Sequence, residues 1–209
     1  MKIKFLKSFI LTIVVLYLGW VSVLYILQRH LIYHPTTFDS YDTSALLNQN
    51  VVVMKDGDLQ WLFLPAPFHS NKVLVYFHGN GGNAIGRIDR VESWRQAGFD
   101  VILAEYPGYG PNSGKPAEED FYRSGRRIID KTLNDFPNVD LYLYGESIGS
   151  GTAVQMATEY DEIALIIECG FSSLTDIVQS KYPIIPTKIL LKDKFDNISK
   201  INRIDSYLL

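Results

Sequence analysis

The fold of this chain is decided by residues 141–151, which run LYLYGESIGSG. An apolar run ends abruptly in a serine between glycines and is followed by helix-forming residues, a pattern that predicts a strand, a tight turn and a helix. Gly145 and Gly149 each stand two residues from Ser147, which is the spacing of a nucleophile elbow. Glycine is needed there because side chains beside so sharp a turn would collide with the neighbouring strand. Ser147 is therefore the candidate nucleophile.

Strand-like and helix-like segments alternate on both sides of this turn. We expect strands at residues 51–53, 59–64, 73–77, 101–105 and 163–167, and helices at residues 85–97 and 117–136. The first two strands form an antiparallel hairpin, because the residues between them, KDGD, are a turn signal. Alternation of this kind predicts an α/β fold with a doubly wound, mostly parallel sheet, and ligands bind at the carboxyl ends of such strands.

The composition indicates one globular domain and excludes some classes of function. The chain has 209 residues, which is enough for a sizeable core. Its 20 basic and 23 acidic residues give a net charge of −3, which argues against a nucleic-acid-binding surface. No sequence motif indicates a metal site or a cofactor. The single cysteine, Cys169, lies in an apolar run and is predicted to be a buried small hydrophobe.

The N-terminal segment is predicted to be a single transmembrane helix. Three lysines lie among the first seven residues, and residues 8–27 carry no charge. A helix of this length spans about 30 Å, the thickness of the hydrocarbon core. The alternative is a cleaved signal peptide, but residues 26–29 offer no small-residue cleavage site. The positive-inside rule keeps the N terminus in the cytoplasm and sends residues 28–209 across the membrane, into the periplasm in a bacterium.

These patterns divide the chain into three parts. Residues 1–27 form the membrane anchor. Residues 28–50 are polar and rich in turn-forming residues, so we expect a connector that packs along the domain. Residues 51–209 form the α/β domain.

Three motifs carry a resemblance to a known family. They are HGNGGN at residues 78–83, EYPGYG at residues 105–110 and GESIGSG at residues 145–151, in this order. Together they resemble an α/β-hydrolase, and more narrowly the membrane-anchored α/β-hydrolase-domain serine hydrolases (serine-aminopeptidase-like). The resemblance implies that Ser147 attacks an ester, thioester or amide bond of a small-molecule or lipid-like acyl substrate. It also implies that the amides of Asn80 and Ile148 form the oxyanion hole.

The sequence departs from the family in its histidines. The family order is serine, then acid, then histidine, yet His30, His34, His69 and His78 all precede Ser147. His78 belongs to the oxyanion loop and is expected to be structural. We therefore expect the chain to stop before the acid and the histidine, so that the C-terminal part of the fold is missing. Residues 206–209 are then either the start of the seventh strand or unrelated.

Several carboxylates could replace the missing acid, and each has a simpler explanation. Glu168 ends the sixth strand but would have no histidine to orient. Glu105 and Glu146 could touch substrate, although charged residues at strand ends are more often solvated. Asp176 is expected in a helix capped near Ser172 and Ser173, whereas Asp193 and Asp196 resemble solvated cap residues. Residues 181–192 lie where the family often inserts lid helices, so they are expected to form a pocket wall or a lid that faces the membrane.

Two functions follow from these expectations. In the first, the protein is a membrane-anchored serine hydrolase that uses Ser147, and this 209-residue chain is a truncated, inactive form. In the second, the chain is a non-catalytic membrane-anchored pseudoenzyme or binding module. The two differ in whether a base ever activates Ser147.

Overall fold

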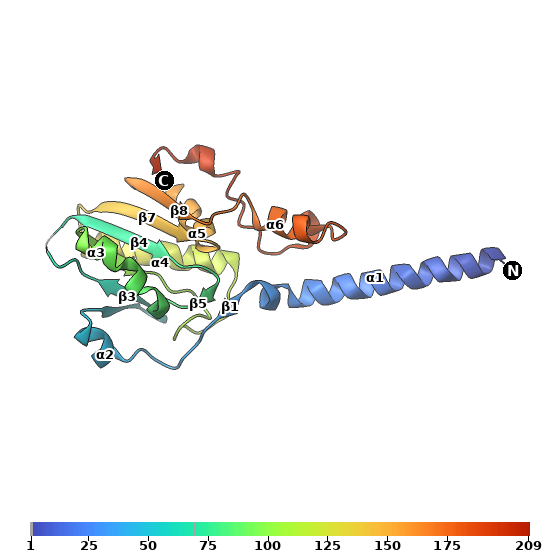
Figure 1. Cartoon of the computed structure of the whole chain (residues 1–209), viewed down its shortest axis with the longest axis horizontal. Helices are drawn as coiled ribbons and strands as arrows, with labels where there is room; N and C mark the ends of the chain where they lie inside the picture. The colour runs from blue at the N-terminus through green and yellow to red at the C-terminus, as the bar shows by residue number, and fades with distance from the viewer. Residues whose placement is uncertain (1, 69) are drawn as a thin grey trace.

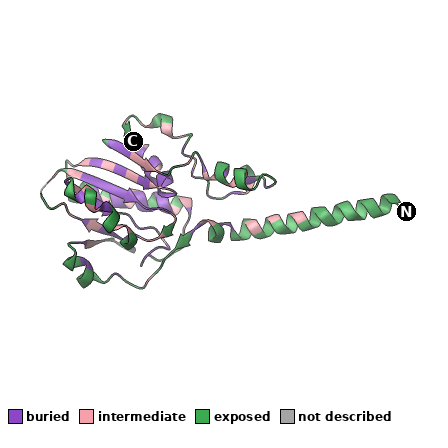
Figure 2. Cartoon of the chain, in the orientation of Figure 1, coloured by how far each residue is buried: buried purple, intermediate pink, exposed green. Residues whose placement is uncertain are grey.

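The computed structural model describes residues 2–68 and 70–209, so the histidine at position 69 lies outside the described residues. A long helix, α1 (Lys2–Ile32), leads into one α/β domain (Figure 1). The helix is long and apolar enough to cross a membrane, and it is exposed along most of its length (Figure 2). It extends five residues beyond the predicted end of the anchor, so the first part of the predicted connector is helical.

The domain is built on a mostly parallel, seven-stranded sheet, which confirms the predicted fold class. Its strands lie in the order β2-β3-β6-β4-β7-β8-β9. They are β2 (Val52–Asp56), β3 (Leu59–Leu64), β4 (Lys72–Phe77), β6 (Phe99–Leu103), β7 (Asp140–Glu146), β8 (Ala164–Glu168) and β9 (Tyr207–Leu208). The β2–β3 hairpin is antiparallel, as predicted, and so is the pairing of β3 with β6; all other neighbours are parallel.

Helices cover both faces of this sheet, as a doubly wound fold requires. On one face lie α4 (Glu118–Asp135) and α5 (Gly149–Ala157), which share a core with side chains from alternate positions of β4 and β7. On the other face lie α2 (Thr43–Asn48) and α3 (Glu92–Gln96). The central strands between these layers are buried (Figure 2). The helix predicted at residues 85–97 is divided into two 3₁₀ turns, Ile85–Arg87 and Asp89–Val91, and the short α3.

The connector between α1 and the sheet runs along the domain. A two-stranded pair joins β1 (His34–Pro35) to β5 (Gly81–Gly82), and Thr37 forms a bridge with Gly110. At the other end of the chain, Tyr207 and Leu208 pair in parallel with β8. Of the two expectations for residues 206–209, the structure therefore supports the start of a seventh strand.

Cys169 contradicts its predicted burial. The residue follows the last position of β8 and adopts a φ of 51°, which turns the chain away from the sheet. Its side chain is exposed, although the strand before it is apolar. The apolar run predicted a strand correctly but did not reveal that the strand ends one residue before the cysteine.

The elbow has the strained geometry that its glycines predict. Ser147 has a φ of 50°, a left-handed conformation that is uncommon for a residue other than glycine. A Cβ atom on Gly149 would lie closer than 3.0 Å to the carbonyl oxygens of Phe77 and His78, and one on Gly145 would overlap the Cα of Ser150. Both glycines are therefore required by close backbone packing, which lets α5 begin directly above the end of β4.

The substitution Gly149→Ala is expected to lower the free energy of unfolding by at least about 2 kcal/mol, because the methyl group has no space beside Phe77. The matched control is Gly81→Ala, since nothing lies within 4 Å of a Cβ atom there, and its effect should stay within about 0.5 kcal/mol. Urea unfolding of the full chain in detergent micelles, followed by circular dichroism, measures both. Equal effects of the two substitutions would contradict the proposed packing constraint.

Candidate active site

The structure brings the three predicted site residues together. Ser147, Ile148 and Asn80 all line one cavity of about 640 Å³. Ser147 lies between β7 and α5, Ile148 is the N-cap of α5, and Asn80 follows β4. The three residues therefore come from the carboxyl ends of two neighbouring parallel strands, where a doubly wound sheet presents its ligand sites.

Two backbone amides beside Ser147 make no hydrogen bond within the described part of the chain. Within residues 2–68 and 70–209, neither the amide of Asn80 nor that of Ile148 donates a hydrogen bond, whereas the amide of Ser147 donates to the carbonyl oxygen of Glu168 at 2.9 Å. Free amides on two segments around a serine are the donors that a tetrahedral oxyanion needs.

The side chain of Asn80 holds its loop in place. Its Nδ2 donates to the carbonyl oxygen of Ile32 at 2.5 Å, and its Oδ1 accepts from the amide of His34 at 3.2 Å. The hydroxyl of Tyr109 also donates to the Asn80 carbonyl oxygen at 2.9 Å. These contacts connect the loop to the C-terminal end of α1.

The walls of the cavity are mostly apolar and come from segments far apart in the sequence. One wall is the C-terminal half of α1, and the other is formed by α6 (Leu174–Lys181) and α7 (Thr187–Leu190). The residues from these walls are Trp20, Val21, Leu24, Tyr25, Gln28, Leu31, Ile32, Leu174, Ile177, Val178, Lys181, Tyr182, Ile185, Thr187, Leu190 and Leu191. The expectation that residues 181–192 form a pocket wall is confirmed, but the contribution of α1 was not predicted.

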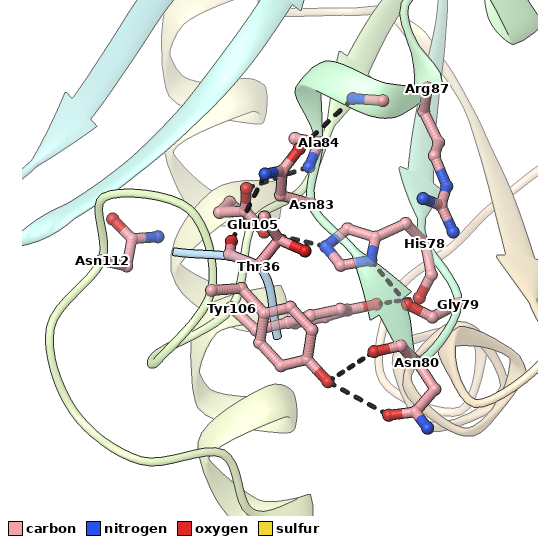
Figure 3. Close-up of polar contacts among 12 residues, drawn as sticks. Thr36, His78, Gly79, Asn80, Asn83, Ala84, Arg87, Glu105, Tyr106 and Asn112 are labelled. Carbon is pink, nitrogen blue, oxygen red and sulfur yellow. Dashed lines mark hydrogen bonds and ion pairs between the residues drawn. The ribbon is translucent and has the colours of Figure 1, made fainter. Parts of the chain in front are cut away.

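His78 has the structural position that was predicted for it. The residue is buried, its Nδ1 donates to the carbonyl oxygen of Gly79 at 2.7 Å, and its Nε2 lies 2.8 Å from the Glu105 carboxylate (Figure 3). Glu105 is 0% exposed and also accepts from the hydroxyl of Tyr41 and the amide of Ala84. The prediction of Glu105 as a solvated or substrate-contacting residue is therefore wrong, because its partners converge on it from three segments.

Glu146 is also engaged within the protein. Its carboxylate accepts from the Arg87 guanidinium at 3.1 and 3.2 Å, from the amide of Gly79 at 3.2 Å and from the hydroxyl of Tyr76 at 3.0 Å. Burial acts to raise the pKa of Glu146, but the Arg87 ion pair and these hydrogen bonds hold it below its usual range. The prediction of a solvated side chain is wrong here too. Glu146 instead connects the elbow to the loop that carries Asn80.

Asp193 was predicted to be a solvated cap residue, and the structure contradicts this. It is only 2% exposed, and its carboxylate accepts two hydrogen bonds from Arg29 at 2.8 and 3.0 Å and one from the amide of Glu118 at 3.1 Å. The carboxylate is buried because α1 and α4 both approach it. Local sequence gave no signal for this contact between residues so far apart in the chain.

The remaining carboxylates have structural contacts. Glu168 accepts a hydrogen bond from the hydroxyl of Tyr144 at 2.7 Å and pairs with Arg90; burial and this carboxylate raise the pKa of Tyr144 to about 12. Asp176 lies in the first turn of α6, and its amide donates to Ser173, which is the N-cap as predicted. The Asp196 carboxylate accepts from the amide of Ser199, in keeping with a cap.

A histidine partner for Ser147 is absent from the described part of the chain. His30 and His34 are exposed on α1 and β1, and His78 is engaged by Glu105 and Gly79. Residues 2–68 and 70–209 also contain no group of three His, Cys, Asp or Glu side chains that could hold a metal ion. The described site thus combines a strained serine, two free amides and an apolar cavity.

The fold agrees with comparisons to known proteins. The chain belongs to the alpha/beta hydrolase fold family, whose model matches residues 72–178. An uncharacterized protein of Mycobacterium tuberculosis strain CDC 1551 is 28% identical over 91% of this chain and 70% of its own length. Human alpha/beta hydrolase domain-containing protein 17B is 26% identical over 74% of this chain and 54% of its own length. The lysophosphatidylserine lipase ABHD12 of Gallus gallus is 27% identical over 59% of this chain and 34% of its own length.

Solved structures share the fold at low sequence identity. An alpha-beta hydrolase from Vibrio vulnificus superimposes with a TM-score of 0.64 at 18% identity, covering 82% of this chain and 68% of that chain. The esterase Pf2001 from Pyrococcus furiosus gives a TM-score of 0.61 at 15% identity, covering 85% of this chain and 74% of that chain. These similarities concern the arrangement of the sheet and its helices.

The low pKa of Glu146 predicts a pH-dependent contribution to stability. The folded state binds the proton less readily than the unfolded state, so this contribution is present above the unfolded value of about 4.3 and is lost as the pH falls through the folded pKa. In Glu146→Gln, the free energy of unfolding should therefore decrease less than in the native chain as the pH is lowered. Urea unfolding at a series of pH values from about 6 to about 3 measures this.

The matched control for this substitution is Glu119→Gln, because the Glu119 side chain is 72% exposed and makes only a surface ion pair with Arg126. It should leave the pH dependence unchanged. An unchanged acid transition in Glu146→Gln would show that the Arg87 pair does not depress the pKa of this carboxyl group.

Proposed function

We propose that this chain carries the nucleophile and the oxyanion-binding amides of a membrane-anchored serine hydrolase. Ser147 is the nucleophile, and the amides of Asn80 and Ile148 stabilise the oxyanion. The observation that carries the proposal is the strained, left-handed Ser147 in the same cavity as two free amides. Each such amide typically contributes about 2.7–4 kcal/mol of transition-state stabilisation.

The reaction would be acyl transfer to Ser147. Its oxygen forms a bond to the carbonyl carbon of an ester, thioester or amide, and the bond from that carbon to the leaving group breaks. The serine proton passes through a general base to the leaving group, and water then releases the acid by the reverse sequence. The described residues supply the oxygen and the two amides for this reaction.

An acyl substrate with a lipid-like chain fits the site best. The cavity walls are apolar over most of their area, and α1 and the α6–α7 segment provide them. A relative of this chain, the chicken protein ABHD12, is named as a lysophosphatidylserine lipase. Long apolar walls beside a serine and two amides suit an ester whose acyl chain is long.

We propose further that α1 crosses the membrane once. Its length and apolar character support a span, and the lysines near its N terminus favour a cytoplasmic N terminus. The α/β domain then lies on the extracytoplasmic side, with residues 28–50 as the connector beyond the anchor.

A second candidate is a non-catalytic binding module. It is favoured by one observation, which is that no histidine contacts Ser147 in the described residues. A serine hydroxyl is a weak nucleophile without a base to accept its proton. The two candidates can be separated by supplying the base from solution.

The test is labelling of the full 209-residue chain in detergent micelles with a fluorescent fluorophosphonate. Without additions we expect little labelling, and no difference between the native chain and Ser147→Ala. Added imidazole should accept the serine proton and increase the labelling, and Ser147→Ala should abolish that increase. The matched control, Ser180→Ala, removes an exposed hydroxyl on α6 and should label like the native chain.

Three results would contradict this scheme. Labelling that imidazole never increases would favour the binding module, and labelling that survives in Ser147→Ala would remove Ser147 as the nucleophile. Strong labelling without imidazole that Ser147→Ala abolishes would instead show that the chain contains its own base.

A further inference from the structure

The α6–α7 hairpin, residues 174–190, lies against the apolar helix α1. The hydroxyl of Tyr17 donates to the carbonyl oxygen of Ile184 at 2.7 Å. Closer to the domain, the side chain of Gln28 accepts from the amide of Lys192 at 2.8 Å and donates to the carbonyl oxygen of Leu190 at 3.3 Å. Figure 1 shows the hairpin leaving the sheet in the same direction as α1. The two segments are therefore joined by hydrogen bonds at the tip of the hairpin, at Ile184, and at its C-terminal base, at Leu190 and Lys192.

The position of these contacts along α1 sets the depth of the hairpin. The ammonium group of Lys192 lies 4.4 Å from the centre of the Tyr25 ring, and lysine with tyrosine is typical of the membrane–water interface. Tyr17 lies eight residues before Tyr25 in the same helix, which is about 12 Å further along its axis. A hairpin tip that contacts Tyr17 therefore lies within one leaflet of a hydrocarbon core about 30 Å thick.

The hairpin exposes several large apolar side chains, as a surface that faces lipid does. Ile184 is 67% exposed and Ile189 is 83% exposed, although both are large and apolar. Ile177 and Tyr182 are also exposed, and both line the cavity as well. They therefore form its rim, and Trp20 of α1 lines the same cavity. The two lysines of the hairpin, Lys181 and Lys188, have stems long enough for their charges to reach the headgroups.

The backbone at the tip provides an independent observation. Five consecutive carbonyl groups, at residues 182–186, each accept a hydrogen bond from within the protein, although this segment is largely exposed and mostly not helical. Their donors are the amides of Ile185, Thr187 and Ile189, the side chain of Gln179 and the hydroxyl of Tyr17. Water would satisfy such carbonyl groups on an aqueous surface, whereas in a bilayer they need partners inside the protein.

We propose that the α6–α7 hairpin is embedded in the leaflet beside α1, and that the cavity opens sideways into the hydrocarbon so that the acyl chain of a bilayer lipid enters between them. The occupant is a lipid chain because one wall of the cavity is the membrane-spanning helix itself. This inference rests on the proposed membrane span and on Ser147 as the reacting group. It makes α1 a wall of the substrate site in addition to an anchor.

Fluorescence quenching tests the depth of the hairpin. Single cysteines at Ile184 and Ile189, in a Cys169→Ser background, are labelled with bimane, and the full chain is reconstituted in phosphatidylcholine–phosphatidylglycerol vesicles. Nitroxides on the lipid acyl chains should quench most of the emission from both positions, and iodide in the water should quench little. The matched control is Leu47→Cys, a comparably exposed leucine on α2 with 61% exposure, where the pattern should be reversed.

Photocrosslinking tests whether the chain of a lipid enters. A phosphatidylcholine with a diazirine at the end of one acyl chain should crosslink to the peptide that contains Ser147 and Ile148, which lie inside the cavity. Val178→Trp should reduce that crosslink by filling the cavity, whereas Leu133→Trp on α4 should leave it unchanged. Retained quenching at Ile184 would show that the Val178→Trp hairpin still folds.

The outcomes separate this inference from the proposed function. Quenching by iodide at Ile184 and Ile189, or the absence of crosslinks to the Ser147 peptide, would overturn the inference that the cavity opens to lipid. This conclusion would hold even if imidazole increases the labelling of Ser147. Conversely, quenching by acyl-chain nitroxides with an unreactive Ser147 would leave the placement of the hairpin intact and remove only the nucleophile.

Discussion

The close approach of Gly149 to the end of β4 is the constraint on which the rest of the site depends. Because no side chain separates Gly149 from the carbonyl oxygens of Phe77 and His78, α5 can begin directly above the sheet. The turn between β7 and α5 must then be sharp, and Ser147 takes the left-handed conformation that such a turn imposes. The same approach brings the loop after β4 beside the turn, so that Asn80 and Ile148 line one cavity with Ser147.

Two carboxylates maintain this arrangement by binding the loop after β4 at different residues. Glu105 binds the loop through His78 and the amide of Ala84, and Glu146 binds it through the amide of Gly79. A loop held in this way suits the proposed oxyanion hole, because donors that are oriented before a substrate arrives stabilise an oxyanion strongly. The two carboxylates are therefore positioning groups, and their cost of burial is offset by several donors each.

Much of the fold could be predicted from the sequence, because its signals are local. The apolar runs predict the strands β4 and β8 in which they lie, and the glycines around Ser147 predict the sharp turn there. The structure agrees with these local predictions. The partners of three carboxylates could not be predicted, because they approach only after the chain has folded. They are His78 for Glu105, Arg87 for Glu146 and Arg29 for Asp193. The exposure of Cys169 was missed for a different reason: whether an apolar residue is buried depends on where its strand ends, and strand ends are the least certain part of a periodic pattern.

The contacts of α1 connect this helix directly to the candidate site. A helix that served only as a tether would end where the domain begins and share no polar contacts with it. Here the Arg29 guanidinium meets the buried Asp193, and the side chain of Asn80, a residue that lines the cavity, donates to the last carbonyl of the same helix. A shift of α1 along its axis would therefore disturb the loop that carries Asn80 through Ile32 and the cavity wall through Gln28. Under the proposed membrane span, the position of α1 in the bilayer and the geometry around Ser147 are thus coupled through direct hydrogen bonds.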